Sequence, residues 1–68
     1  MTDSDLIRSC IAACARNPDG RYARWCRRKL ARALLNTGTS PTIAAATAWA
    51  AQRVGQQIAE TAHKGRPC

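Results

Sequence analysis

Apolar residues recur every three or four positions along most of the chain, which is the spacing of one face of an α-helix. This pattern predicts three helices, at about residues 5–16, 21–36 and 41–63. No stretch alternates apolar and polar residues in the way a strand does. The sequence therefore predicts an all-α fold, a small three-helix bundle with short turns, built as a single domain over residues 1–68.

Turn and capping residues place the helix ends. Ser4 or Asp3 is expected to cap the first helix, and the run Asn-Pro-Asp-Gly at 17–20 ends it, with Asp19 as a candidate cap for the second helix. Gly38 suits the left-handed position that follows a helix. The pair Ser-Pro at 40–41 opens the third helix, and residues 64–68 are expected to form a flexible tail.

Each predicted helix has an apolar stripe, and the three stripes are expected to meet in the core. The stripe of the first helix consists of Leu6, Ile7, Cys10, Ile11 and Cys14. The stripe of the second consists of Tyr22, Ala23, Cys26, Leu30, Ala33 and Leu34. The stripe of the third consists of Ile43, Ala46, Thr47, Ala50, Val54, Ile58 and Thr61.

The composition makes this core thin. The chain is 46% hydrophobic, but it has fourteen alanines and no phenylalanine, and alanine buries little area. Small domains of this kind often gain stability from association. A homodimer or a bound partner is therefore a possible source of the stability that the core lacks.

The charge is strongly basic, with eleven Lys and Arg against four acids and a net charge of +7. Six of these bases and no acid lie between Arg21 and Leu35. Arg21, Arg24, Arg28 and Arg32 fall within about 80° of one another, opposite Leu30, and Trp25 points close to Arg32. Like charges four residues apart destabilise a helix, so a segment that keeps them is expected to meet an anion.

The third helix adds a second aromatic residue outside its predicted stripe. Trp49 lies beside Arg53 there, and Trp and Arg are the residues most enriched at binding hot spots. The alternative is that Trp49 packs against the first helix and covers the edge of the core. The candidate binding residues are Arg21, Arg24, Trp25, Arg28, Arg32, Trp49 and Arg53.

Three interpretations of this basic face stay open. Arginines can fork onto the phosphates of DNA or RNA, and Trp25 can stack on a base. The same residues suit an acidic protein surface, as in the short accessory proteins typical of phages and plasmids that inhibit or adapt a host protein. The third interpretation is a solvated face without a partner.

A helix-turn-helix reader of DNA fits the sequence poorly. The segment 30–49 has the outline of two helices joined by a glycine turn. However, the second of these helices would offer Thr42, Ala45, Ala46 and Trp49 to the bases, and these residues provide few hydrogen bonds to base edges. Contact with the nucleic-acid backbone by the preceding basic helix is the better interpretation.

The cysteines favour buried thiols over a metal site. Cys10 and Cys14 lie within the apolar stripe, and Cys26 can face them, with His63 and Cys68 as distant candidate ligands. Zinc sites show two closely spaced ligand pairs, and only one such pair is present here. We therefore expect no metal and no cofactor, although disulfide linkage of Cys26 stays an alternative in an oxidising compartment.

Other classes of protein are disfavoured. One histidine, four dispersed acids and the absence of a glycine-rich phosphate loop predict that the protein is not an enzyme. No apolar run reaches the roughly 18 residues of a membrane span, and the start of the chain does not resemble a signal peptide. A cytoplasmic location is therefore expected, as is a role as a small binding protein or regulator.

Overall fold

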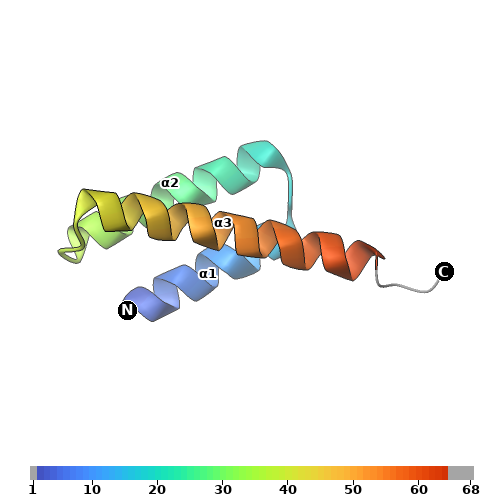
Figure 1. Ribbon diagram of the computed structural model, residues 1–68, viewed down its shortest axis with the longest axis horizontal. Helices are drawn as coiled ribbons and strands as arrows, with labels where there is room; N and C mark the ends of the chain where they lie inside the picture. The colour runs from blue at the N-terminus through green and yellow to red at the C-terminus, as the bar shows by residue number, and fades with distance from the viewer. Residues whose placement is uncertain (1, 65–68) are drawn as a thin grey trace.

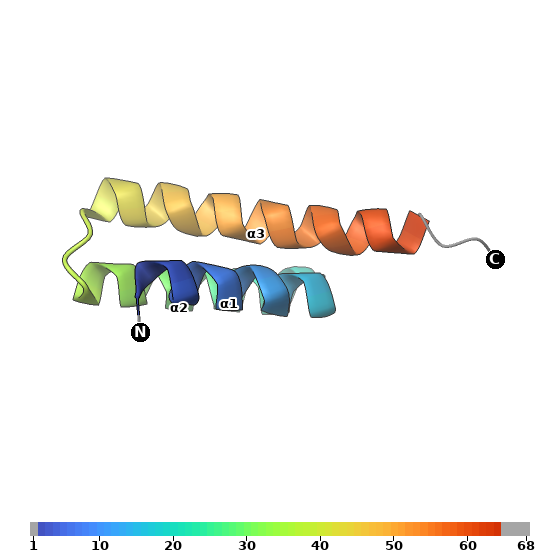
Figure 2. The ribbon, with the colours of Figure 1, turned by 90° about the horizontal axis from the view of Figure 1, so that it is seen from below.

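The computed structural model describes residues 2–64, and for residues 63 and 64 the backbone alone. It contains α1 (Asp3–Arg16), α2 (Gly20–Asn36) and α3 (Pro41–Lys64), packed against one another, which confirms the predicted three-helix bundle. Figure 1 shows α1 and α3 running in one direction and α2 running back, with α3 crossing the space between α1 and α2. In Figure 2, α3 forms a second layer over α1 and α2, and its C-terminal turns extend beyond both.

The helix ends follow capping chemistry, with one correction to the prediction. Thr2 caps α1, where the sequence pattern favoured Ser4 or Asp3: the Asp5 N–H donates to Thr2 Oγ1 at 3.3 Å, and the Thr2 N–H donates to Asp5 Oδ2 at 3.3 Å. This reciprocal pair satisfies two N–H groups at once, so α1 begins before Ser4. Asp19 caps α2 as predicted, since its Oδ1 accepts from the Arg21 N–H at 3.3 Å.

The connection between α2 and α3 is short and well defined. Gly38 has a φ of 96°, a left-handed conformation that glycine adopts without strain, and it lies just after the C-cap of α2. The Ile43 N–H then donates to Ser40 Oγ at 3.4 Å at the start of α3. Thr39 Oγ1 donates to Asp3 Oδ2 at 3.5 Å, which ties this turn to the first residue of α1. The N-terminal ends of α1 and α3 are thereby held together.

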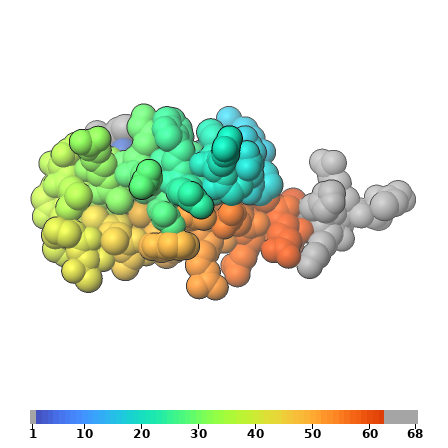
Figure 3. Space-filling view, turned by 90° about the horizontal axis from the view of Figure 1, so that it is seen from above, coloured from blue at the N-terminus to red at the C-terminus, as the bar shows by residue number. Residues whose placement is uncertain are grey.

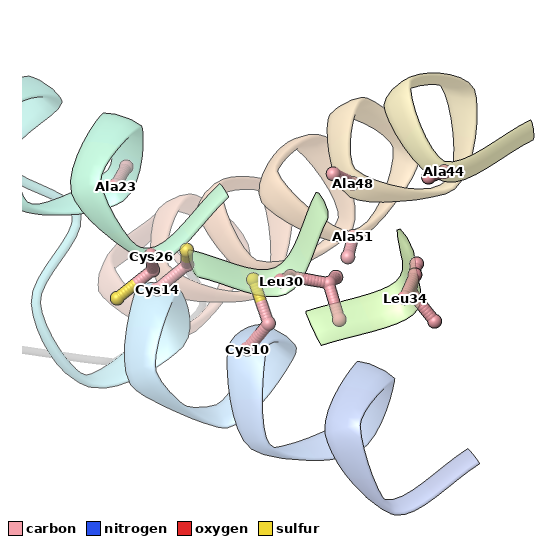
Figure 4. Packing of buried hydrophobic residues seen from close by; sticks show 9 residues of the cluster. All are labelled: Cys10, Cys14, Ala23, Cys26, Leu30, Leu34, Ala44, Ala48 and Ala51. Atoms are coloured by element: carbon pink, nitrogen blue, oxygen red, sulfur yellow. The ribbon is translucent and has the colours of Figure 1, made fainter. Parts of the chain in front are cut away.

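The predicted stripes of α1 and α2 do form the core. The buried members are Cys10 and Cys14 from α1 and Ala23, Cys26, Leu30 and Leu34 from α2 (Figure 4). Leu6, Ile7 and Ile11 pack against this cluster while staying partly exposed. The apolar periodicity of these two helices therefore identifies their inner faces.

The predicted stripe of α3 is wrong. Its buried residues are Ala44, Ala48, Ala51, Gln52 and Gly55, whereas Ile43, Val54 and Ile58 are 59%, 42% and 47% exposed. The reason is the close approach of α3 to α1. A Cβ at Gly55 would lie 2.5 Å from the Cβ of Cys14 and 2.7 Å from the backbone oxygen of Ile11. Only small residues fit at this contact, so the bulky side chains of α3 lie outside it.

One polar side chain of α3 faces the core. Gln52 is buried, and its Oε1 has no hydrogen-bond partner among the described residues, while its Nε2 donates to Gln56 Oε1 at 3.5 Å.

The C-terminal end of α3 lies one residue later than predicted. Lys64, expected in the tail, closes α3, and residues 65–68 of the expected tail lie outside the described part of the chain. Across residues 2–64, none of the helices combines the length and the apolar character that crossing a bilayer requires.

Candidate nucleic-acid interface

The outer face of α2 carries a ridge of four arginines. We call Arg21, Arg24, Arg28 and Arg32, together with Trp25, the basic ridge. All five side chains are exposed, while Leu30 on the opposite side of α2 is buried. Arg24, Arg28 and Arg32 succeed one another at one helical turn, so their guanidinium groups share one side of the helix. The predicted geometry of this segment therefore holds.

The guanidinium groups of the basic ridge have no neutralising carboxylate beside them within residues 2–62. In the described part of the chain, no ion pair joins any of the four arginines to a carboxylate. The nearby acids serve the helix ends, since Asp5 and Asp19 accept capping hydrogen bonds and Asp3 accepts one from Thr39. The positive charge of α2 is therefore available to an anion from outside.

Trp25 lies within this charge and is 54% exposed. Lys29 Nζ is 4.6 Å from the centroid of the indole ring, and the ring of Tyr22 stacks beside it with centroids 6.0 Å apart. A cation this close to an aromatic face is attracted by its quadrupole, which holds the indole in place. An open hollow of about 470 Å³ adjoins the ring, lined by Trp25, Arg28, Lys29, Arg32, Ala33 and Asn36.

Trp49 extends this surface from α2 onto α3. Its side chain is 53% exposed, and Arg27 Cζ of α2 lies 3.9 Å from the centroid of its ring. This contact joins Trp49 to α2, whereas the alternative placed Trp49 against the first helix. Figure 3 shows α2 and α3 forming one continuous surface. Arg53 is exposed one turn beyond Trp49 on α3.

Three residues of this surface were not among the predicted site residues. Tyr22 belongs to the apolar stripe of α2, and Arg27 and Lys29 flank it. These three residues contact the two tryptophans through stacking and cation–π interactions. The sequence contained a signal for the contact between Lys29 and Trp25, because residues four apart face each other on a helix. The contact between Arg27 and Trp49 depends on how α2 and α3 align, which the periodicity of either helix does not give.

The geometry of α2 and α3 also differs from that of a helix-turn-helix. In that motif two helices cross steeply, so that the second can enter the major groove alone. Here α2 and α3 run side by side in opposite directions (Figures 1 and 2). The α3 residue Ala44, in the turn that a recognition helix would present, is buried against the core.

The three cysteines of the core are free thiols. Their sulfur atoms lie near one another between α1 and α2 (Figure 4). Burial, together with the neighbouring Cys14 and Cys26, raises the pKa of Cys10 to about 12, and burial also raises the pKa of Cys14. Such thiols keep their protons at neutral pH. Among the described residues, no group of three or more His, Cys, Asp or Glu is arranged to hold a metal ion; the side chains of His63 and Cys68 lie outside them.

Comparison with known proteins yields no relative, since no family model, curated protein or solved structure matches this chain.

Proposed function

We propose that the protein binds nucleic acid through the basic ridge and acts as a small DNA- or RNA-associated regulator. The observation that carries the proposal is the row of four exposed, unneutralised arginines around a half-exposed tryptophan. Arg24 and Arg32 are separated by about 12 Å along α2. Within a duplex, one strand carries a phosphate roughly every 3.4 Å of axis, so this span faces several phosphates.

The expected mode of binding is contact with the backbone together with stacking. Each guanidinium can fork onto a phosphate and release counterions. A base that enters the hollow beside Trp25, with Arg28 and Arg32 at its rim, would take the place of Lys29 Nζ on the indole face. Stacking of this kind needs an unpaired base, so the arrangement favours single strands and does not depend on their sequence.

Fluorescence anisotropy with a labelled single-stranded oligonucleotide, titrated with salt, tests the proposal. Arg28→Gln is expected to weaken binding about 5- to 10-fold and to lower the salt slope by about one phosphate contact, since one charge-assisted contact is lost. Trp25→Ala is expected to weaken binding at least about 5-fold with an unchanged salt slope, because it removes stacking and no charge.

Arg8→Gln is the matched control, because Arg8 is an exposed arginine of α1 outside the basic ridge. It removes the same charge and is expected to have a much smaller effect. Equal losses from Arg8→Gln and Arg28→Gln would show that only net charge matters. The absence of binding at low salt, to single strands and duplexes alike, would refute the proposal.

An acidic protein surface is the second candidate partner. Leu35 is 44% exposed on the side of α2 that carries Arg28. An apolar side chain at this place would contribute to binding a protein surface but not to binding a phosphate backbone. A pull-down from the host with and without nuclease separates the two candidates. Recovery that resists nuclease and is lost on Arg28→Glu would favour an inhibitor or adaptor of phage or plasmid type. For either partner we place the protein in the cytoplasm, a proposal supported by the free thiols of Cys10, Cys14 and Cys26.

A further inference from the structure

The outward flank of α3 carries an apolar stripe that no other described part of the chain covers. We call Ile43, Thr47, Ala50, Val54 and Ile58 the α3 stripe, since they fall within about 80° of one another around the helix. Ile43, Val54 and Ile58 are 59%, 42% and 47% exposed. Only two leucines and no isoleucine or valine are buried among the described residues, so much of the aliphatic surface lies outside.

The residues of the α3 stripe are spaced symmetrically about the middle of the stripe, so the spacing is the same when α3 is read in either direction. Ile43 and Ile58 lie at equal distances from the midpoint between Ala50 and Ala51, and so do Thr47 and Val54. If two copies of α3 pair in opposite directions about a twofold axis at this midpoint, Ile43 of each copy meets Ile58 of the other. Ala50 at the axis lets the helices approach closely. A twofold interface requires this kind of self-complementarity.

Charge also favours a second copy at this face. The chain has a net charge of +7, so two copies repel each other wherever their bases face. From Pro41 to Ala62, α3 contains one base and one acid, Arg53 and Glu60, whereas α2 contains six bases and no acid. The α3 stripe lies on the flank of α3 away from Trp49, which contacts α2. Pairing there leaves the basic ridges of both copies uncovered.

We infer that the α3 stripe is the interface of an antiparallel homodimer in which Ile43 of each copy packs against Ile58 of the other. This inference stands independently of nucleic-acid binding. Its test is sedimentation equilibrium of the full, nuclease-treated chain at moderate salt over about two decades of concentration. The expected mass at the upper end is twice 7.4 kDa. A monomer throughout would refute the inference.

Charge substitutions test the arrangement of the two copies. Ile43→Lys and Ile58→Glu are each expected to raise the dissociation constant of the dimer at least about 10-fold, because each buries an unpaired charge. The double variant is expected to recover dimerisation to within about 3-fold of the unsubstituted chain, since the new base of one copy faces the new acid of the other. Parallel pairing would place like charges together, so failure of this recovery would overturn the antiparallel arrangement.

Leu35→Lys on α2 is the matched control. Leu35 is an aliphatic residue of similar exposure, at 44%, that lies outside the α3 stripe. Its substitution is expected to leave the dissociation constant within about 2-fold, and an effect as large as that of Ile43→Lys would show unspecific association. Far-ultraviolet circular dichroism of each variant verifies that the bundle is folded, which is expected because all three side chains are exposed.

Discussion

The inner faces of α2 and α3 meet the same core with different side chains. From α2 come two leucines, a cysteine and an alanine, which reach into the space between the helices. From α3 come alanines, a glycine and one glutamine, which bring its backbone close to its neighbours. The comparison shows two ways of excluding water from one core. The side chains of α2 fill the space between the helices, whereas the small residues of α3 let the helices approach until little space remains. Each way predicts a different sensitivity to substitution.

The largest effect is expected where α2 fills volume. Leu34 is 2% exposed and is among the largest fully buried side chains, so Leu34→Ala leaves a cavity and is expected to cost about 2–5 kcal/mol. The adjacent Leu35→Ala is expected to cost less than about 1 kcal/mol, because Leu35 is exposed. Urea unfolding followed by circular dichroism measures both. Similar losses would mean that α2 does not insert its leucines as described.

A smaller loss of stability is expected where α3 approaches α1, and there it comes from adding volume rather than removing it. Gly55→Ala adds a single methyl group and improves helix propensity, yet it is expected to cost about 1–3 kcal/mol. The added Cβ would meet the Cβ of Cys14 and the backbone oxygen of Ile11, and a backbone atom has little freedom to move aside.

Gly20→Ala in α2 provides the control, because a Cβ at Gly20 has no neighbour within 4 Å. It is expected to leave stability unchanged or to raise it by up to about 1 kcal/mol. If thermal unfolding showed Gly55→Ala to be as well tolerated as Gly20→Ala, the close contact of α3 with α1 would be disproved.

The smallest effect is expected from making the inner face of α3 as apolar as that of α2. Gln52→Leu removes a buried Oε1 that has no partner among the described residues, and it is expected to stabilise the bundle by about 1 kcal/mol. The exposed Gln57→Leu is expected to change stability by less than about 0.5 kcal/mol. A loss of stability in the unfolding curve of Gln52→Leu would instead mean that the amide holds a water or a polar partner.

The same comparison explains which parts of the fold the sequence could predict. Bulky residues mark the inner face of α2 because Leu30 and Leu34 are also its buried residues. In α3 the periodicity of Ile43, Val54 and Ile58 is just as regular, but it marks an outer flank. The small residues at 44, 48, 51 and 55 form a second periodic set, and choosing between the two sets requires the distance between helices. That distance is set by the packing of the whole bundle.

The candidate site was predictable to a similar extent. Helical geometry alone placed Arg24, Arg28 and Arg32 on one side of α2. The stacking of Arg27 on Trp49 was not predictable, because it joins two helices whose relative alignment no local pattern records. The cap of α1 was missed for a local reason. Asp3 and Ser4 are themselves good capping residues, and only the reciprocal hydrogen bonds of Thr2 and Asp5 distinguish the real one.

The rate at which the protonated thiols between α1 and α2 react with an alkylating reagent reports how often the helices separate. With a pKa of about 12, the folded Cys10 supplies almost no thiolate at neutral pH, whereas a solvated thiol titrates near 9. An alkylating reagent therefore modifies Cys10 chiefly in those moments when the helices separate. Because a thiol with a raised pKa favours the folded state only while it stays protonated, raising the pH from about 9 towards 12 progressively withdraws that contribution, and labelling should accelerate in step.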